Sequence, residues 1–258
     1  MKKKSIVSVI LSGILAFGLV GCGSTSNTAS SSGSNGNDKV IKIGVSPEPH
    51  KKIVDAAVPV LEKEGYKVEV TEFNDYVLPN TALSEGELDA NYFQHTPYLN
   101  EENKSRKLNL VSAGAIHLEP MGLYSKKIKN LDDLKEGATI AIPNDSSNEA
   151  RALKLLVANG LIEVKDGELV TLSDITSNPK NLKFTELEAA AVPRSIDDVD
   201  AAVINSNYAI PAGFNPTNDS IVIEDKDSEA AKPYANIVAV RSGDENSEKI
   251  KALVKALQ

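Results

Sequence analysis

Aromatic and imidazole side chains gather in one part of the sequence, where they could form a binding pocket. The chain has only 7 Tyr and 5 Phe and no Trp, yet five of these side chains lie within residues 73–98. They are Phe73, Tyr76, Tyr92, Phe93 and Tyr98. His95 and Tyr98 follow a predicted strand, at the position where α/β folds open their ligand crevice. An apolar box with His and Tyr at its rim could hold an apolar side chain, although aromatic side chains also commonly fill cores.

An anion site is predicted around the segment AIPNDSSNEARALKLL, residues 141–156. A strand ends there, and the Ser146-x-x-Glu149 spacing predicts a capping box at the start of a helix. The free N–H groups of a helix start attract anions. Arg151 lies in the first two turns and could add a guanidinium that suits a carboxylate. The alternative is a surface arginine paired with Glu149 or another acid.

Three asparagines offer neutral hydrogen-bonding groups near predicted strand ends. Asn205 and Asn207 follow one strand, and Asn236 begins another. Asparagine at a strand end commonly forms a turn. Together, however, the three amides could bind an ammonium group or a second carboxylate oxygen.

The sequence contains little catalytic or metal-binding apparatus. The motifs GxxxxGK[ST], GxGxxG, HExxH and GxSxG are absent. His50, His95 and His117 could join Glu119 around a metal, but their spacing matches no common ligand pattern. We therefore predict no metal, no cofactor and no enzymatic activity. The net charge of −8 also argues against nucleic acid as a partner.

The elements that position these residues alternate between strands and helices. Predicted strands cover residues 40–45, 66–73, 89–93, 108–118, 121–125, 138–143, 182–187, 200–205, 220–224 and 236–241. Predicted helices cover residues 50–64, a short stretch after Leu78, residues 147–159 and residues 247–257. This alternation predicts an α/β fold with largely parallel sheets. We expect two lobes, residues 39–118 plus 236–258 and residues 119–235, with the terminal helix packed on the first; one large domain is the alternative.

The N-terminus has the pattern of a lipoprotein signal. Lys2, Lys3 and Lys4 precede an apolar run that is too short to span a membrane comfortably. The sequence LVGC then ends at Cys22, the single cysteine of the chain. We predict a signal peptide over residues 1–21, lipid on Cys22 and a flexible tether over residues 22–38. The alternative is a buried cysteine in an uncleaved helix.

Long segments of the chain closely resemble the methionine-binding lipoproteins of bacterial ABC importers, the NlpA lipoprotein family. They are residues 73–99, HLEPMGLYSKKIKNLDDLKEGATIAIPNDSSNEARAL, LKFTELEAAAVPRSIDDVDAAVINSNYA and PYANIVAVRSGD. The resemblance runs from about Lys42 to the C-terminus. It departs from the family pattern at Ser146, often Pro in relatives, and at Ser206, often Gly.

The resemblance implies a two-lobed periplasmic-binding-protein fold, type II-like, with the ligand in the cleft between the lobes. It implies that the aromatic segment holds the methionine side chain, that an arginine holds the carboxylate and that asparagines hold the head group. The matching residues are Tyr76, Phe93, His95 and Tyr98 for the side chain, Arg151 for the carboxylate, and Asn205, Asn236 and, less directly, Asn207 for the head group.

The leading hypothesis is a monomeric, lipid-anchored protein on the outer side of the cell membrane. It would deliver L- or D-methionine to an ABC permease driven by a cytoplasmic ATPase. The alternatives are binding of a methionine-containing dipeptide or another small apolar amino acid, a metal-assisted hydrolase using His95, His117 and Glu119, or an adhesin without a small ligand.

Overall fold

The computed structural model describes residues 39–258. The predicted signal peptide, tether and lipidated Cys22 therefore lie outside the described residues. The strands are β1 Val40–Val45, β2 Lys67–Glu72, β3 Ala90–His95, β4 Leu110–Leu118, β5 Gly122–Tyr124, β6 Thr139–Pro143, β7 Glu163–Val164, β8 Ile175–Ser177, β9 Lys183–Leu187, β10 Ala201–Ile204, β11 Val222–Ile223 and β12 Ala235–Arg241. The helices are α1 Lys52–Lys63, α2 Leu78–Ser84, α3 Thr96–Arg106, α4 Ser146–Ala158, α5 Ser206–Ala209 and α6 Glu248–Leu257.

The first five-stranded sheet has the order β2-β1-β3-β12-β4. Strand β12 runs antiparallel to both of its neighbours, while β1 is parallel to β2 and β3. One face packs against α1 and α6 through an apolar core that includes Ile43, Leu61 and Leu253. The other face packs against α2 through a smaller core around Leu83 and Leu88. The sheet is thus covered on both faces, as expected for parallel strands.

The second five-stranded sheet has the order β11-β5-β10-β6-β9. Here β5 is the reversed strand, and β6 is parallel to β9 and β10. The core on one face joins the sheet to α4 through residues such as Leu153 and Ile140. The core on the opposite face includes Tyr124, Val192 and Ala209.

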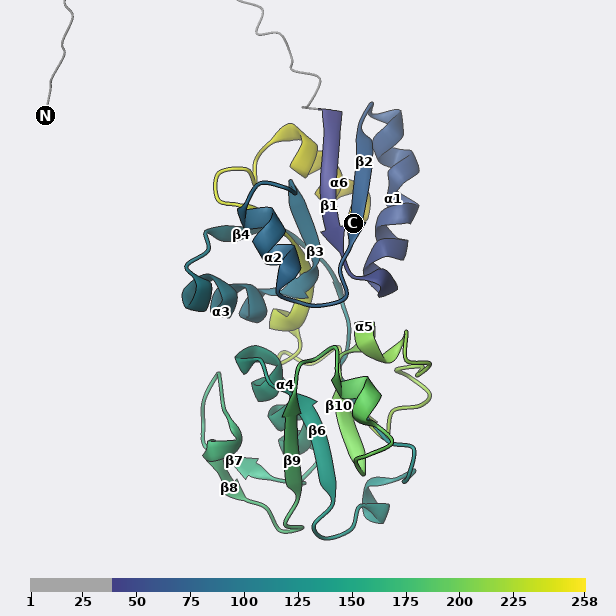
Figure 1. Cartoon of the computed structure of the whole chain (residues 1–258), viewed down its shortest axis with the longest axis vertical. Coiled ribbons are helices and arrows are strands. Elements are labelled where there is room, and N and C mark those ends of the chain that lie inside the picture. The colour runs from purple at the N-terminus through teal and green to yellow at the C-terminus, as the bar shows by residue number, and fades with distance from the viewer. Residues whose placement is uncertain (1–38) are drawn as a thin grey trace, which may run out of the picture. The chain divides into compact units, whose positions relative to one another are not determined.

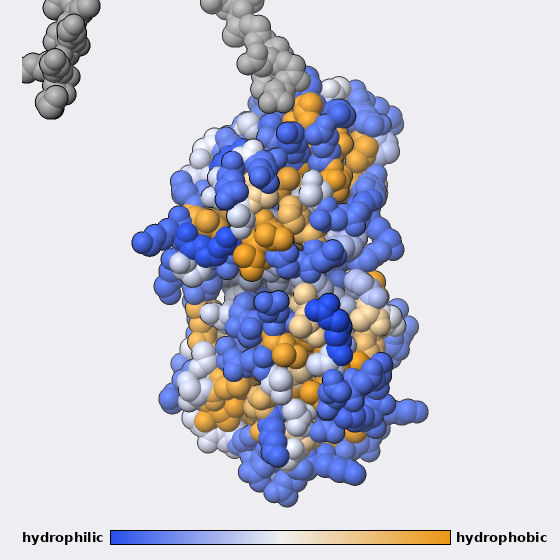
Figure 2. Space-filling view, viewed as in Figure 1, coloured by the Kyte–Doolittle hydropathy of each residue, from blue (hydrophilic) through white to orange (hydrophobic). Residues whose placement is uncertain are grey.

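The chain connects the two sheets twice, and this places the functional segments between two lobes. It leaves the first sheet after β4, enters the second at β5 and returns to the first at β12 (Figure 1). The visible face of the molecule is mostly hydrophilic and is hollowed where the two lobes meet (Figure 2). Within the described residues, no helix is both long and apolar enough to cross a membrane.

Most of the predicted elements are confirmed. The sheets are largely parallel, Pro79 lies in the first turn of α2, and Gly65 ends the α1 region with a positive φ of 84°. Helix α6 buries Ile250, Leu253 and Leu257 against the first sheet, as its amphipathic pattern predicts.

Three local predictions differ from the structure. Helix α3 was not expected, since its sequence TPYLNEENKSR is polar on almost every side. Helix α5 begins directly after Asn205, where only a turn was expected. The strand expected over residues 220–224 is reduced to the two residues of β11.

Candidate functional site

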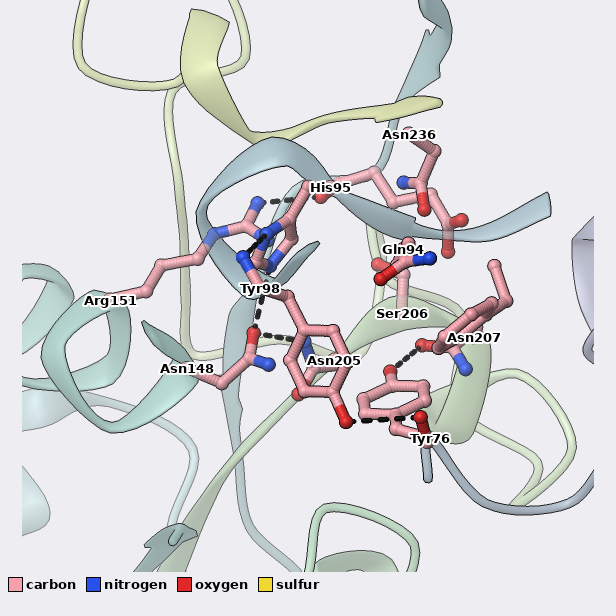
Figure 3. Close-up of a pocket in the computed structure, with 12 residues that line it drawn as sticks. Tyr76, Gln94, His95, Tyr98, Asn148, Arg151, Asn205, Ser206, Asn207 and Asn236 are labelled. Atoms are coloured by element: carbon pink, nitrogen blue, oxygen red, sulfur yellow. Dashed lines mark hydrogen bonds between the residues drawn. The ribbon is translucent and has the colours of Figure 1, made fainter. Parts of the chain in front are cut away.

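One pocket lies between the lobes and contains every ligand-binding residue that the sequence predicts (Figure 3). Its lining residues are Tyr76, Phe93, Gln94, His95, Tyr98, Glu119, Asn148, Arg151, Asn205, Ser206, Asn207 and Asn236. The first lobe supplies the aromatic side chains, from strand β3, helix α3 and the loop before α2. The second lobe supplies Arg151 and two of the three predicted asparagines. The free space at the centre is about 20 Å³, little more than one water molecule needs. Side chains from the two lobes therefore nearly fill the space between them.

Three aromatic rings form the apolar part of the pocket. The centroid of the Tyr76 ring lies 5.6 Å from that of Phe93 and 5.5 Å from that of Tyr98. The Tyr98 hydroxyl donates to the Tyr76 carbonyl oxygen at 3.0 Å, which links the two residues. Burial raises the pKa of Tyr76 well above its usual value, so its hydroxyl remains a donor and bonds Asn207 Oδ1 at 2.6 Å. The bond joins the two lobes at the edge of the pocket.

The other two aromatic residues of the segment belong to the cores, as the alternative interpretation allowed. Tyr92 points to the opposite face of β3 from Phe93 and packs in the first-lobe core. Phe73 packs against the smaller core beneath α2. The sequence cluster thus divides between pocket and core.

Arg151 is held rigidly at the polar end of the pocket. Its side chain is only 4% exposed, and Nε donates to Glu224 Oε1 at 3.0 Å while Nη2 donates to Glu224 Oε2. Nη2 also donates to the Glu119 carbonyl oxygen at 2.8 Å, and the guanidinium stacks on the Tyr234 ring at 4.3 Å. Arg151 is therefore not on the surface, although it does pair with an acid other than Glu149, as the alternative interpretation allowed. Nη1 has no hydrogen-bond partner among the described residues, which leaves one edge of the fork for a ligand.

The start of α4 is organised by Asp145, not by the predicted capping box. The Asp145 carboxylate accepts from the Asn148 backbone N–H at 3.0 Å and caps the helix. The Glu149 side chain instead accepts from the Leu172 N–H at 2.9 Å. The prediction that Ser146 and Glu149 form a capping box is wrong because the residue before Ser146 is a stronger acceptor.

Asp145 also fixes the orientation of three pocket amide and imidazole groups. Its carboxylate accepts from Asn148 Nδ2, so Asn148 Oδ1 faces the pocket. That oxygen accepts from Asn205 Nδ2 at 2.9 Å and from His95 Nε2 at 3.2 Å. His95 Nδ1 accepts from the Tyr98 N–H, and burial, aided by Arg151, lowers the pKa of His95 to about 3. His95 is therefore neutral at physiological pH.

A second polar cluster lies behind Asn236. His50 Nε2 is 3.0 Å from Asn236 Oδ1 and 3.2 Å from Glu119 Oε1. His117 Nε2 is 2.9 Å from the same Glu119 oxygen. His50, His117 and Glu119 thus each place one possible ligand atom, a ring nitrogen or a carboxylate oxygen, within 4.8 Å of the other two. His95, the remaining candidate metal ligand, is not part of this group.

Four lining residues were not predicted as ligand-binding residues. Asn148 lies one helical turn before Arg151, and that spacing could have identified it. Glu119 was considered only as a metal ligand, although it lies in the segment that connects the lobes. Nothing in the sequence distinguishes Gln94 and Ser206 from their neighbours. In the structure, the Gln94 amide forms hydrogen bonds with Asn80 and Asn91. The Ser206 hydroxyl donates to the Pro120 carbonyl oxygen at 2.6 Å.

Solved structures identify the class of this fold. The chain matches an ABC transporter, periplasmic substrate-binding protein from Coxiella burnetii with a TM-score of 0.80 and 48% identity, covering 84% of this chain and 91% of that one. It matches a nutrient binding protein from Burkholderia cenocepacia bound to methionine with a TM-score of 0.81 and 50% identity, covering 84% and 91%. The two lobes with a pocket between them are those of a periplasmic substrate-binding protein.

Sequence comparison identifies the family. The family model described as NlpA lipoprotein matches residues 41–258. The D-methionine-binding lipoprotein MetQ of Salmonella typhi is 48% identical over 84% of this chain and 81% of its own length. The chain belongs to the NlpA lipoprotein family, as its sequence segments predict.

Proposed function

We propose that this protein binds methionine between its lobes and delivers it to an ABC transporter. The observation that carries the proposal is the pairing of a fixed arginine edge with a ring of aromatic side chains inside one closed pocket. Arg151 Nη1 suits the carboxylate of an amino acid. Tyr76, Phe93 and Tyr98 suit a thioether, which gains about 0.3–1.5 kcal/mol from each aromatic contact. The similarity to a methionine-bound structure and to D-methionine-binding lipoproteins supports the same ligand.

Calorimetric titration tests this function directly. Protein freed of bound ligand is titrated with L-methionine, D-methionine, leucine and norleucine. We expect saturable binding of at least one methionine enantiomer and weaker binding of leucine. The three aromatic side chains contact a thioether favourably, and the space between them suits the unbranched side chain of methionine better than the branched side chain of leucine. An absence of heat with both enantiomers would overturn the function.

The remaining parts of the transport role follow from the same proposal. Residues 39–118 with 236–258 form the first lobe and residues 119–235 the second, a division that the membership of the strands in two sheets supports. Lipid on Cys22 anchors a monomer to the membrane, and a permease with a cytoplasmic ATPase receives the ligand. Globomycin treatment of expressing cells, followed by mass spectrometry of the N-terminal peptide, tests the anchor: the precursor should accumulate, and a mature peptide that begins elsewhere than at Cys22 would exclude it.

We also propose that the protein is not an enzyme. The relatives named above are substrate-binding proteins, and a metal-assisted hydrolase of the kind considered would require His95 to join His117 and Glu119. Instead His95 Nε2 bonds Asn148. Elemental analysis of purified protein tests this point, since stoichiometric zinc would favour the hydrolase.

A further inference from the structure

The Glu119 carboxylate has one satisfied and one unsatisfied oxygen at the wall of the pocket. Its side chain is 11% exposed and lies in the segment that joins β4 to β5. Oε1 faces both His50 and His117, whereas Oε2 is buried without any hydrogen-bond partner in the described chain. A buried carboxylate oxygen without a donor is costly. The imbalance indicates that a donor is supplied from outside the protein.

Both histidines face Oε1 of Glu119 through their Nε2 atoms. His117 Nε2 faces a carboxylate, which can only accept, so this nitrogen carries a proton, and Nδ1 forms a hydrogen bond with the Tyr92 hydroxyl. His50 Nε2 faces two oxygen acceptors, Asn236 Oδ1 and Glu119 Oε1, so it also carries the proton. Its Nδ1 accepts from Ser46 Oγ at 2.7 Å. Burial lowers the pKa of His50, which keeps that imidazole uncharged. Both rings therefore face Oε1, and neither supplies a donor to Oε2.

The pocket has a second acceptor without a partner. Asn205 Nδ2 is bound to Asn148, which leaves Asn205 Oδ1 buried and unsatisfied. The same pocket thus presents a carboxylate oxygen and an amide oxygen that lack donors, and it presents Arg151 Nη1 and Asn207 Nδ2 as donors that lack acceptors. A ligand that satisfies these four atoms carries a negative group and a positive group with several N–H donors. A free α-amino acid has both, attached to the same carbon atom.

We propose that Glu119 binds the α-ammonium of the ligand and restricts the site to amino acids with a free amino group. The inference rests on the proposed function, and it narrows the substrate class. A peptide with C-terminal methionine keeps the carboxylate for Arg151 but presents an uncharged amide with a single N–H to Glu119. N-acylated methionine has the same defect. Both place an uncharged group beside Glu119 Oε2 and so lose the ion pair with the ligand ammonium, and such a loss is strongly unfavourable in a buried pocket.

The test compares ligands that differ only at the amino group. Wild-type protein and Glu119→Gln are titrated with the preferred methionine enantiomer, its des-amino analogue 4-(methylthio)butanoate, N-acetylmethionine and glycylmethionine. Wild type should bind methionine at least about 100-fold more tightly than the other three. Glu119→Gln should reduce the ratio between methionine and the des-amino analogue to less than about 10-fold, because only methionine loses an ion pair. Glu149→Gln, a buried acid outside the pocket, should keep the wild-type ratio.

The outcomes separate this inference from the proposed function. A merely structural role for Glu119 would weaken all four ligands equally, and an unchanged ratio in Glu119→Gln would overturn the inference while methionine binding stands. Tight binding of glycylmethionine to wild type would overturn it as well, without requiring any variant to fold. If wild type binds no methionine at all, the proposed function fails and the inference fails with it.

Discussion

The polar residues of the pocket form two networks of contacts. Each network leaves one atom without a hydrogen-bond partner among the described residues, Asn205 Oδ1 in the first and Arg151 Nη1 in the second. In one, the Asp145 carboxylate orients Asn148, and Asn148 orients both His95 and Asn205. In the other, Glu224 and Tyr234 hold Arg151 with one nitrogen left free. Side chains arranged in this way lose little freedom when a ligand arrives, which favours affinity.

Replacing Arg151 by lysine should weaken methionine binding about 100-fold. Lysine keeps the charge, but it cannot donate to Glu224, to the Glu119 carbonyl and to a ligand carboxylate from one planar group. Isothermal titration of Arg151→Lys measures the loss. Arg241→Lys is the matched control, because Arg241 bonds the carbonyl oxygens of Leu83 and Leu88 in the first lobe and does not line the pocket. Equal methionine affinities of wild type and Arg151→Lys would show that Arg151 does not bind the ligand carboxylate.

The low pKa of His95 should make stability depend on pH. The folded-state pKa is about 3 and the ordinary value is 6.5, so between these values the unfolded chain binds a proton that the folded chain does not. The contribution of neutral His95 to the free energy of unfolding is therefore fully present above pH 6.5 and is lost as the pH falls toward 3. From pH 7.5 to pH 5 the loss is about 2 kcal/mol. Urea unfolding of wild type and His95→Gln at both pH values measures it; the variant should lose less stability on acidification, and equal losses would contradict the pKa of His95.

At the level of elements, the sequence predicts what periodicity governs and misses what tertiary contacts decide. Strands β1 and β6 and helix α6 have strong patterns of apolar residues and were predicted. Helix α3 has no such pattern and buries only Tyr98 and Leu99, with His95 as its N-cap. The partner of Arg151 was equally hidden, because Glu224 lies 73 residues further along the chain. Proximity of that kind arises only when the second lobe folds.

The contact between α6 and β4 gives a prediction about packing. A Cβ atom at Gly114 would lie 2.7 Å from Val254 Cγ1, and valine has few alternative rotamers with which to move away. We expect Gly114→Ala to destabilise the protein by about 1–3 kcal/mol through overpacking. Val254→Ala should cost stability in the wild-type background but less in the Gly114→Ala background, because it relieves the clash. Urea unfolding of the four proteins measures this coupling, and additive losses would show that the helix moves without strain.

At the scale of the whole molecule, the two lobes also contact each other through a residue that does not line the pocket. Tyr208 belongs to α5, yet its ring centroid lies 4.8 Å from that of Tyr76 and its hydroxyl donates to the Asn74 carbonyl oxygen at 3.4 Å. Tyr208 does not line the ligand pocket. It therefore joins the two lobes through Tyr76 and Asn74 without itself lining the pocket where the ligand is proposed to bind.

Substituting Tyr208 should weaken ligand binding from outside the pocket. When a ligand binds only the closed form, the free energy of closure reduces its apparent affinity. A variant that closes less readily therefore binds the ligand more weakly, even with every pocket residue intact. An aromatic pair and a weak hydrogen bond together account for about 1–2 kcal/mol, so Tyr208→Ala should lower methionine affinity about 10-fold. Small-angle scattering should show that the variant needs more methionine than wild type to become compact. Tyr66→Ala is the control, because it removes a buried ring from the core of the first lobe. It should lower the melting temperature and leave the methionine affinity unchanged. If Tyr208→Ala also leaves the affinity unchanged, the contacts of Tyr208 with Tyr76 and Asn74 do not control closure.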